Sequence, residues 1–211
     1  MDQYIVLAKK AVKSYLKEGE ILKPPSDLPK EMLTKKAGVF VSIYKNLARG
    51  ENLVTRSSSQ RSCSLRAARN KKTSQPVSQS ANQLELRGCI GTFLPTCDCL
   101  ASEIIKNAIS ASSNDPRFLP IQENELEDIH CSVDILSSPQ RISNLEELDP
   151  KKYGLIVRCG AKTGLLLPDI AGVDKREHQI MIACQKAGID PSKESIKIYR
   201  FTVERHKEEN K

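Results

Sequence analysis

Residues 84–93 read LELRGCIGTF, a short apolar run that contains a cation, a thiol and two glycines. Strand alternation would place Arg87 and Cys89 on the same face, about 6.5–7 Å apart along the chain, which an arginine side chain can reach across. A guanidinium beside a thiol favours the thiolate, the form that attacks electrophiles or binds metal. Arg87 and Cys89 are therefore candidate catalytic residues. Alternatively, Arg87 could be buried and paired with Glu85 or a loop carboxylate, in which case its charge would stabilise the fold.

The two glycines of this run, Gly88 and Gly91, are candidate ligand-binding residues. Without side chains they would let a ligand approach the backbone, and exposed amides there could hold an anion. The alternative is that Cys89 is a small buried hydrophobe and that the glycines mark a bend. Residue chemistry alone favours this alternative, because an active cysteine also needs a base whose position the sequence does not give.

Several stretches resemble, in order, the signature segments of the AMMECR domain family, named for the AMME syndrome chromosomal region. They are LRGCIGTF at 86–93, DPRF at 115–118, HCSVDILSSP at 130–139, YGLIVR at 153–158, GLLLPDIAG at 164–172 and ACQKAGID at 183–190. In many bacteria and archaea, members of this family are protein A of the Amme–Memo–radical-SAM system. The resemblance covers nearly the whole chain except about residues 50–83, and it implies one AMMECR-like domain over residues 1–211.

The expected order of elements is helix, strands, helix, strands, helix, strand, which predicts an α+β protein with a largely antiparallel sheet flanked by helices. The resemblance implies the same class, with a smaller second lobe and a cleft near the LRGCIG strand. The individual elements that we expect are helices over 3–17, 99–111 and 175–186, a strand over 38–44 paired with 84–93, a strand over 131–135, a hairpin of 154–158 with 165–167, and a closing strand over 195–204.

The DPRF segment supplies two more candidates for ligand binding, Asp115 and Arg117. Matched to the family, it is the D-x-R-F element, with Leu119 where proline is more common. Asp115 can accept backbone hydrogen bonds in the turn. Arg117 could bind a carboxylate or phosphate with two hydrogen bonds, or it could pair with Glu123 or Glu125 and fix the loop.

Other polar residues have simpler interpretations. We expect Asp98 to cap the helix that begins at Cys99. His130 and Asp134 could form an acid–base pair, but with Ser132 they fit better as the solvated face of a strand. The tail from residue 206 to 211 should fray.

Composition indicates a protein without a membrane span. Of 211 residues, 39% are hydrophobic and only 4% aromatic, so the core must be mostly aliphatic. Residues 1–16 are too charged for a signal peptide, and no apolar run is long enough to cross a bilayer. We expect a cytoplasmic protein, or a nuclear one if the source is a eukaryote. Seven cysteines without regular spacing indicate free thiols, and the pair Cys97 and Cys99 is too close for a zinc knuckle, so no metal site is expected.

The formal charge of +7 is concentrated in one segment. Residues 51–82 hold six cations and one acid, so only +2 remains for the rest of the chain, which argues against a nucleic-acid partner except through this basic segment. The segment also holds eight serines and few large apolar residues. We therefore expect a disordered Ser/Arg-rich insertion over about 50–83, at the tip of a hairpin that is short in the family.

Two functions from different classes follow. In the first, the protein acts on or binds a small molecule in a cleft lined by Arg87 and Cys89, with no cofactor identified. In the second, it is a non-catalytic module that binds a partner protein, such as a Memo-like or radical-SAM protein.

Overall fold

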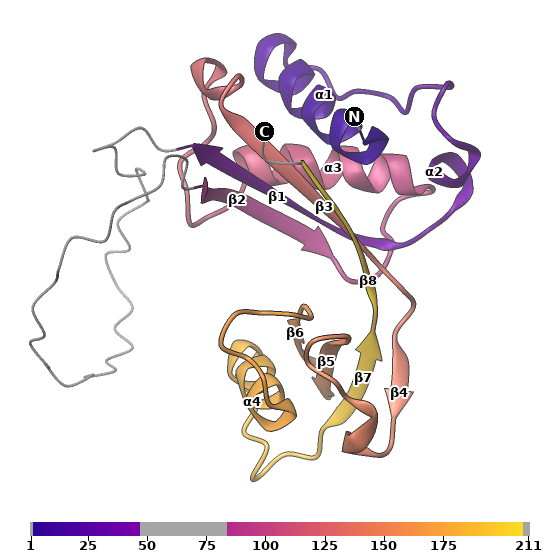
Figure 1. Ribbon diagram of the computed structural model, residues 1–211, viewed down its shortest axis with the longest axis vertical. Coiled ribbons are helices and arrows are strands. Elements are labelled where there is room, and N and C mark those ends of the chain that lie inside the picture. Colours follow the sequence, from indigo (N-terminus) through magenta and orange to yellow (C-terminus); the bar gives the residue numbers. More distant parts are fainter. Residues whose placement is uncertain (1, 47–83, 209–211) are drawn as a thin grey trace, which may run out of the picture.

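The computed structural model describes residues 2–46 and 84–208 (Figure 1). The expected insertion over 50–83 lies outside these residues. The helices in the described part are α1 (Gln3–Glu18), α2 (Lys30–Thr34), α3 (Leu100–Ser113) and α4 (Arg176–Ala187). The strands are β1 (Gly38–Asn46), β2 (Leu84–Thr92), β3 (Ile129–Leu136), β4 (Gln140–Ile142), β5 (Gly154–Cys159), β6 (Lys162–Leu166), β7 (Lys197–Phe201) and β8 (Val203–Lys207). The α+β class is confirmed, with two antiparallel sheets in place of one.

A side-chain cap and two glycines determine where α1 and α4 begin or end. The Asp2 carboxylate accepts a hydrogen bond from the backbone N–H of Tyr4 and caps α1. Gly19 and Gly188 end α1 and α4 in the left-handed conformation, with φ of 70° and 63°. None of the described helices is long and apolar enough to cross a membrane.

The first sheet has the strand order β2-β1-β3-β8. The predicted pairing of β1 with β2 is confirmed, with Val41 opposite Ile90 and Ser42 opposite Cys89. Helices α1 and α3 cover one face of this sheet (Figure 1), where alternate residues of β1 and β3 enter an aliphatic core. Members of this core include Ile5, Leu7, Val39, Val41, Ile43, Leu100, Ile104, Cys131, Val133 and Ile135. We call the opposite face of the first sheet the outer face.

The second sheet has the strand order β4-β7-β5-β6 and packs against α4 on one side. The hairpin of β5 and β6 is confirmed, with Leu155 opposite Leu166. The single closing strand expected over 195–204 is wrong. The strand is interrupted at Thr202, so that β7 pairs within the second sheet and β8 pairs within the first.

The two sheets define two lobes. The first lobe comprises the described residues up to Leu136 together with β8, and the second lobe comprises residues 137–202. The second lobe lies on the outer-face side of the first sheet, opposite the helices (Figure 1). A small apolar cluster of Leu136, Ile156 and Phe201, with Phe40 and Phe93 against it, joins the lobes.

Two predictions about polar positions are wrong. Ser132 and Asp134 point away from the helix-side core as expected, but both are buried rather than solvated, and Arg205 of β8 holds Asp134 with two hydrogen bonds. The start of the expected frayed tail is also ordered. His206 contacts the Asp2 carboxylate at 2.6 Å, and Glu208 accepts a hydrogen bond from Cys131 N.

Candidate functional site

A bulge in β2 separates the two residues that alternation had placed together. Ile43 faces Gly88 and Tyr44 faces Leu86, so Arg87 is an extra residue without a partner on β1. Such a residue interrupts the alternation of faces. The Cys89 side chain lies on the outer face with Ser42, whereas the Arg87 side chain turns to the loop of residues 119–125. The prediction that Arg87 and Cys89 share a face is therefore wrong.

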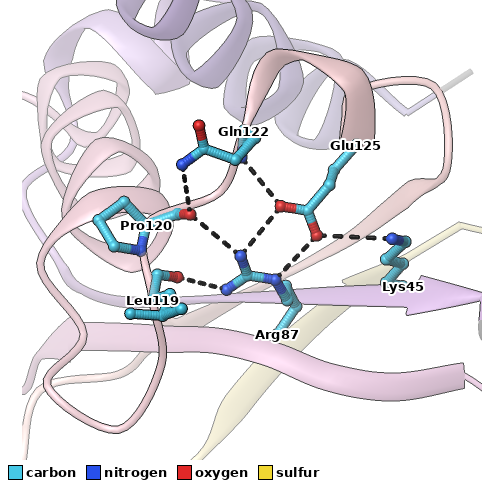
Figure 2. Close-up of polar contacts among 6 residues, drawn as sticks. All are labelled: Lys45, Arg87, Leu119, Pro120, Gln122 and Glu125. Carbon is cyan, nitrogen blue, oxygen red and sulfur yellow. Dashed lines mark hydrogen bonds and ion pairs between the residues drawn. The ribbon is translucent and has the colours of Figure 1, made fainter. Parts of the chain in front are cut away.

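The Arg87 guanidinium holds that loop with four hydrogen bonds (Figure 2). It makes two hydrogen bonds to Glu125, each 3.0 Å long. It also donates to the carbonyl oxygens of Leu119 at 2.6 Å and Pro120 at 3.1 Å. Lys45 adds a second cation 3.6 Å from the Glu125 carboxylate. Burial acts to raise the pKa of Glu125, but the hydrogen bonds from Arg87 and from Gln122 N outweigh it and hold the pKa below its usual range.

The two glycines of β2 serve close packing. A Cβ on Gly88 would lie 2.1 Å from the carbonyl oxygen of Ala111, so the missing side chain lets α3 approach the sheet. A Cβ on Gly91 would lie 2.3 Å from the ring of Phe40 and 2.5 Å from Val39 O. These contacts account for both glycines within the fold, and the prediction that they bind a ligand stays untested.

Asp115 holds the DPRF turn against the free edge of β2. One carboxylate oxygen accepts a hydrogen bond from Cys89 N at 2.8 Å, and the other accepts one from Arg117 N at 3.0 Å. The predicted role of Asp115 as an acceptor of backbone hydrogen bonds is confirmed. Burial acts to raise its pKa, but the hydrogen bonds from Arg117 and Cys89 N outweigh it and lower the pKa.

Arg117 is the cation beside Cys89. Its Nη2 lies 3.1 Å from Cys89 O and 2.7 Å from the Asp115 carboxylate. The alternative of pairing with Glu123 or Glu125 is wrong. The hydrogen bond to the Asp115 carboxylate raises the pKa of the Arg117 guanidinium. Because 55% of the Arg117 side chain is exposed, against 2% for Asp115, part of the guanidinium can still meet a ligand.

A row of small polar side chains crosses the outer face from Cys89. Ser42 of β1 is opposite Cys89, and Ser132 of β3 is opposite Ser42. The Ser42 hydroxyl donates a hydrogen bond to Cys89 Sγ at 3.1 Å. We call Cys89, Ser42 and Ser132 the outer-face row. Sequence reasoning missed Ser42, although the alternation of Val41 and Ile43 around it already placed it away from the core.

A buried carboxylate, Glu103, holds the connection from β2 to α3 and was also missed. It accepts hydrogen bonds from Thr92 Oγ1 at 2.5 Å, Thr96 N at 2.7 Å and Cys97 N at 2.8 Å. The predicted cap at Asp98 is wrong, since the residue before α3 is Cys99 and no side chain caps it. The S/T-x-x-E spacing of a capping box is absent here, so no short motif predicts that Glu103 is a buried hydrogen-bond acceptor.

Two further features lie away from β2. A hollow of about 490 Å³ is bordered by residues 146, 148–150 and 174–177 of the second lobe, and none of the predicted site residues lines it. Within the described ranges, no group of three or more His, Cys, Asp or Glu side chains is placed to hold a metal ion.

Comparison with known proteins agrees with the two-lobed fold. The sequence profile of the family described as AMMECR1 matches residues 5–206. The chain belongs to the AMMECR1 family. An AMMECR1-family relative in Thermotoga maritima is 42% identical over 204 residues, which is 97% of each chain. One in Clostridium acetobutylicum is also 42% identical, over 98% of this chain and 36% of its own length.

The AMMECR1 fold has also been solved. The crystal structure of an uncharacterised protein from Pyrococcus horikoshii matches 99% of this chain and 91% of its own, with a TM-score of 0.73 and 30% identity. The resemblance seen in the sequence is thereby confirmed for family and fold.

Proposed function

We propose that this protein binds a small molecule on the outer face of its first sheet, with the Cys89 thiol as a direct contact. The observation that carries the proposal is the outer-face row. The Cys89 thiol, the Ser42 hydroxyl and the buried Ser132 hydroxyl occupy directly paired positions on three adjacent strands, on the sheet face opposite α1 and α3. Small polar groups at such positions can supply the few directed hydrogen bonds that fix a ligand.

The positions of the histidines favour binding over nucleophilic catalysis. A cysteine nucleophile needs a base whose side chain lies about 3 Å from the thiol, although this distance is often longer when no substrate is bound. The chain has three histidines, and the structure describes all of them. His130 contacts Asn46, His206 contacts Asp2, and His178 lies on α4 in the second lobe. No histidine is therefore paired with the Cys89 thiol, whose hydrogen-bond partner is the Ser42 hydroxyl.

Arg117, and not Arg87, supplies positive charge to this site. Four of the five N–H groups of the Arg87 guanidinium donate to Glu125 and two carbonyl groups. Arg117 is fixed by Asp115 next to Cys89 O and remains more than half exposed. A guanidinium held in this way keeps one edge for a ligand at little entropic cost.

The proposal is tested by alkylation of the native protein with iodoacetamide, with and without the small-molecule fraction of its source cells. We expect that fraction to slow modification of Cys89, while Cys97 and Cys159 in the same chain keep their rates. Ser42→Trp should abolish the protection, because it fills the outer-face row. Ser26→Trp, exposed between α1 and α2, is the matched control. Equal slowing at all three cysteines, or no slowing at Cys89, would overturn the proposal.

A further inference from the structure

A second polar row lies on the second sheet, on the side that faces the first lobe. Arg158 of β5 is opposite Thr163 of β6 and opposite Lys197 of β7. Arg158 follows Ile156 on the same face of β5, and Ile156 is part of the cluster that joins the lobes. We call Thr163, Arg158 and Lys197 the cation row.

The two cations of this row are not neutralised within the described chain. Like charges at directly opposite positions of an antiparallel pair are destabilising. Some other cations of the second lobe have carboxylate partners, as Lys162 has in Glu194 and Lys151 in Asp174. Among the residues that the structure describes, no carboxylate lies within 4.0 Å of the charged nitrogens of Arg158 or Lys197. An unbalanced pair of this kind suits an anion from outside the chain.

Aromatic rings orient Arg158 toward the first lobe. Its guanidinium carbon lies 5.8 Å from the centre of the Phe93 ring, which follows β2, and 6.0 Å from that of Tyr199 on β7. These contacts fix the guanidinium without consuming its N–H groups. The N–H groups therefore remain free for two-pronged binding of a phosphate or carboxylate.

We infer that the cation row binds the phosphate or carboxylate group of a small molecule held between the two lobes. This inference rests on the proposed function, because Phe93, which contacts Arg158, lies on the same side of the first sheet as Cys89. Four residues of extended chain separate Phe93 from Cys89, a distance of about 13 Å. An elongated anionic molecule could therefore contact Arg158 at one end and the outer-face row at the other. The ligand class is thus a phosphorylated or carboxylated small molecule.

Isothermal titration calorimetry with inorganic phosphate, and separately with succinate, tests the cation row in the intact chain. We expect one of the two anions to bind, and the stronger binder identifies the ligand's anionic group. Arg158→Gln and Lys197→Gln should each weaken binding about tenfold, since each removes a charge-assisted hydrogen bond. Lys10→Gln, which removes the same charge from an exposed position on α1, should leave the affinity unchanged. If neither anion binds the wild-type protein, or if Arg158→Gln and Lys197→Gln both bind as tightly as wild type, the inference is overturned. Lys197 is exposed, so its replacement tests the row even if Arg158→Gln fails to fold.

The two proposals can fail separately. If phosphate binding depends on Arg158 while Cys89 shows no protection from iodoacetamide, the cation row stands and the outer-face function falls. If Cys89 is protected while anion binding ignores Arg158, the cation row falls and the outer-face function stands.

Discussion

Arg87 and Glu125 are joined by two parallel hydrogen bonds, from Nε to Oε1 and from Nη2 to Oε2, each 3.0 Å long. The two side chains are only 7% and 13% exposed. The bulge in β2 frees Arg87 from the alternation of its strand, and the loop of residues 119–125 closes over the guanidinium. The charge within the LRGCIG motif therefore stabilises the fold.

The first prediction concerns this ion pair. Arg87→Ala should lower the free energy of unfolding by about 3–5 kcal/mol, because it leaves Glu125 buried without its partner. Arg87→Lys keeps the charge but loses the two-pronged geometry, so its loss should be smaller. Urea denaturation measures both. Arg117→Ala, at a more exposed arginine, should cost less than Arg87→Ala, and the reverse order would contradict this assignment.

A second prediction concerns Glu103, which is 1% exposed and accepts hydrogen bonds from two backbone N–H groups. In Glu103→Gln an N–H₂ group must replace one acceptor oxygen, so a buried donor would lose its partner. We expect a loss of about 1–3 kcal/mol in the free energy of unfolding. Glu85→Gln, at an exposed carboxylate of β2, should be nearly neutral by the same measurement.

The same carboxylate predicts a pH dependence. Burial acts to raise the pKa of Glu103, but its hydrogen bonds from Thr92, Thr96 N and Cys97 N outweigh this and lower the pKa. A lowered folded-state pKa contributes stability above the unfolded value of about 4.3, and this contribution is lost as the pH falls through the folded value. The stability gap between wild type and Glu103→Gln should therefore shrink below about pH 4.3. Urea denaturation between pH 7 and pH 3 checks this, and a gap that widens on acidification would refute it.

Gly88→Ala tests the close approach of α3 to β2. The added Cβ would meet Ala111 O at 2.1 Å, so the helix must shift, at a cost of about 1–3 kcal/mol or more. Gly19→Ala is the control that measures the cost of a positive φ without a steric clash, because Gly19 has a φ of 70° and no atom within 4 Å of an added Cβ. Chemical denaturation of both variants should show the larger loss for Gly88→Ala. A smaller loss at Gly88 would mean that α3 is not fixed by this contact.

The thiol of Cys131 should be inert in the native protein. Burial raises its pKa to about 12, so almost no thiolate exists at neutral pH. Iodoacetamide should modify Cys131 only after unfolding, as peptide mass spectrometry can show. Cys159, which is half-buried, should react earlier. Early modification of Cys131 would indicate that β3 opens locally.

Sequence reasoning succeeded where local pattern determines structure. The helix ending at Gly19, the pairing of Ser42's strand with the LRGCIG strand, and the hairpin of residues 154–166 all follow from periodicity and turn residues. It failed where a single residue changes the register. The bulge at Arg87 has no sequence signature, because it depends on contacts with distant segments. The change from even to odd apolar positions over residues 196–203 indicated an irregularity near Thr202, but not that the two halves of the strand would join different sheets.

The candidate site divides in the same way. Asp115 was assigned its backbone hydrogen bonds from the DPRF turn, because Asp in such a turn acts locally. For Arg87, the structure shows one of the alternatives left open, the ion pair with a loop carboxylate, Glu125. For Arg117, it shows neither Glu123 nor Glu125 but Asp115, because the choice among several acids is made by the tertiary fold. Arg158 and Lys197 were not recognised at all, since they lie 39 residues apart and meet only across paired strands.

The break at Thr202 has a consequence for how the molecule assembles. β3 and β8 are antiparallel neighbours, so the whole second lobe occupies the place of a hairpin turn between them. Its two ends are fastened together, with Ser137 N donating to Thr202 O at 3.0 Å and Thr202 N donating to Ser137 Oγ at 2.9 Å. A folded second lobe presents these ends already side by side, which removes most of the loop-closure entropy that would oppose the addition of β8. The folded second lobe therefore favours the pairing of β8 with β3, and with it the hydrogen bonds between Arg205 and Asp134.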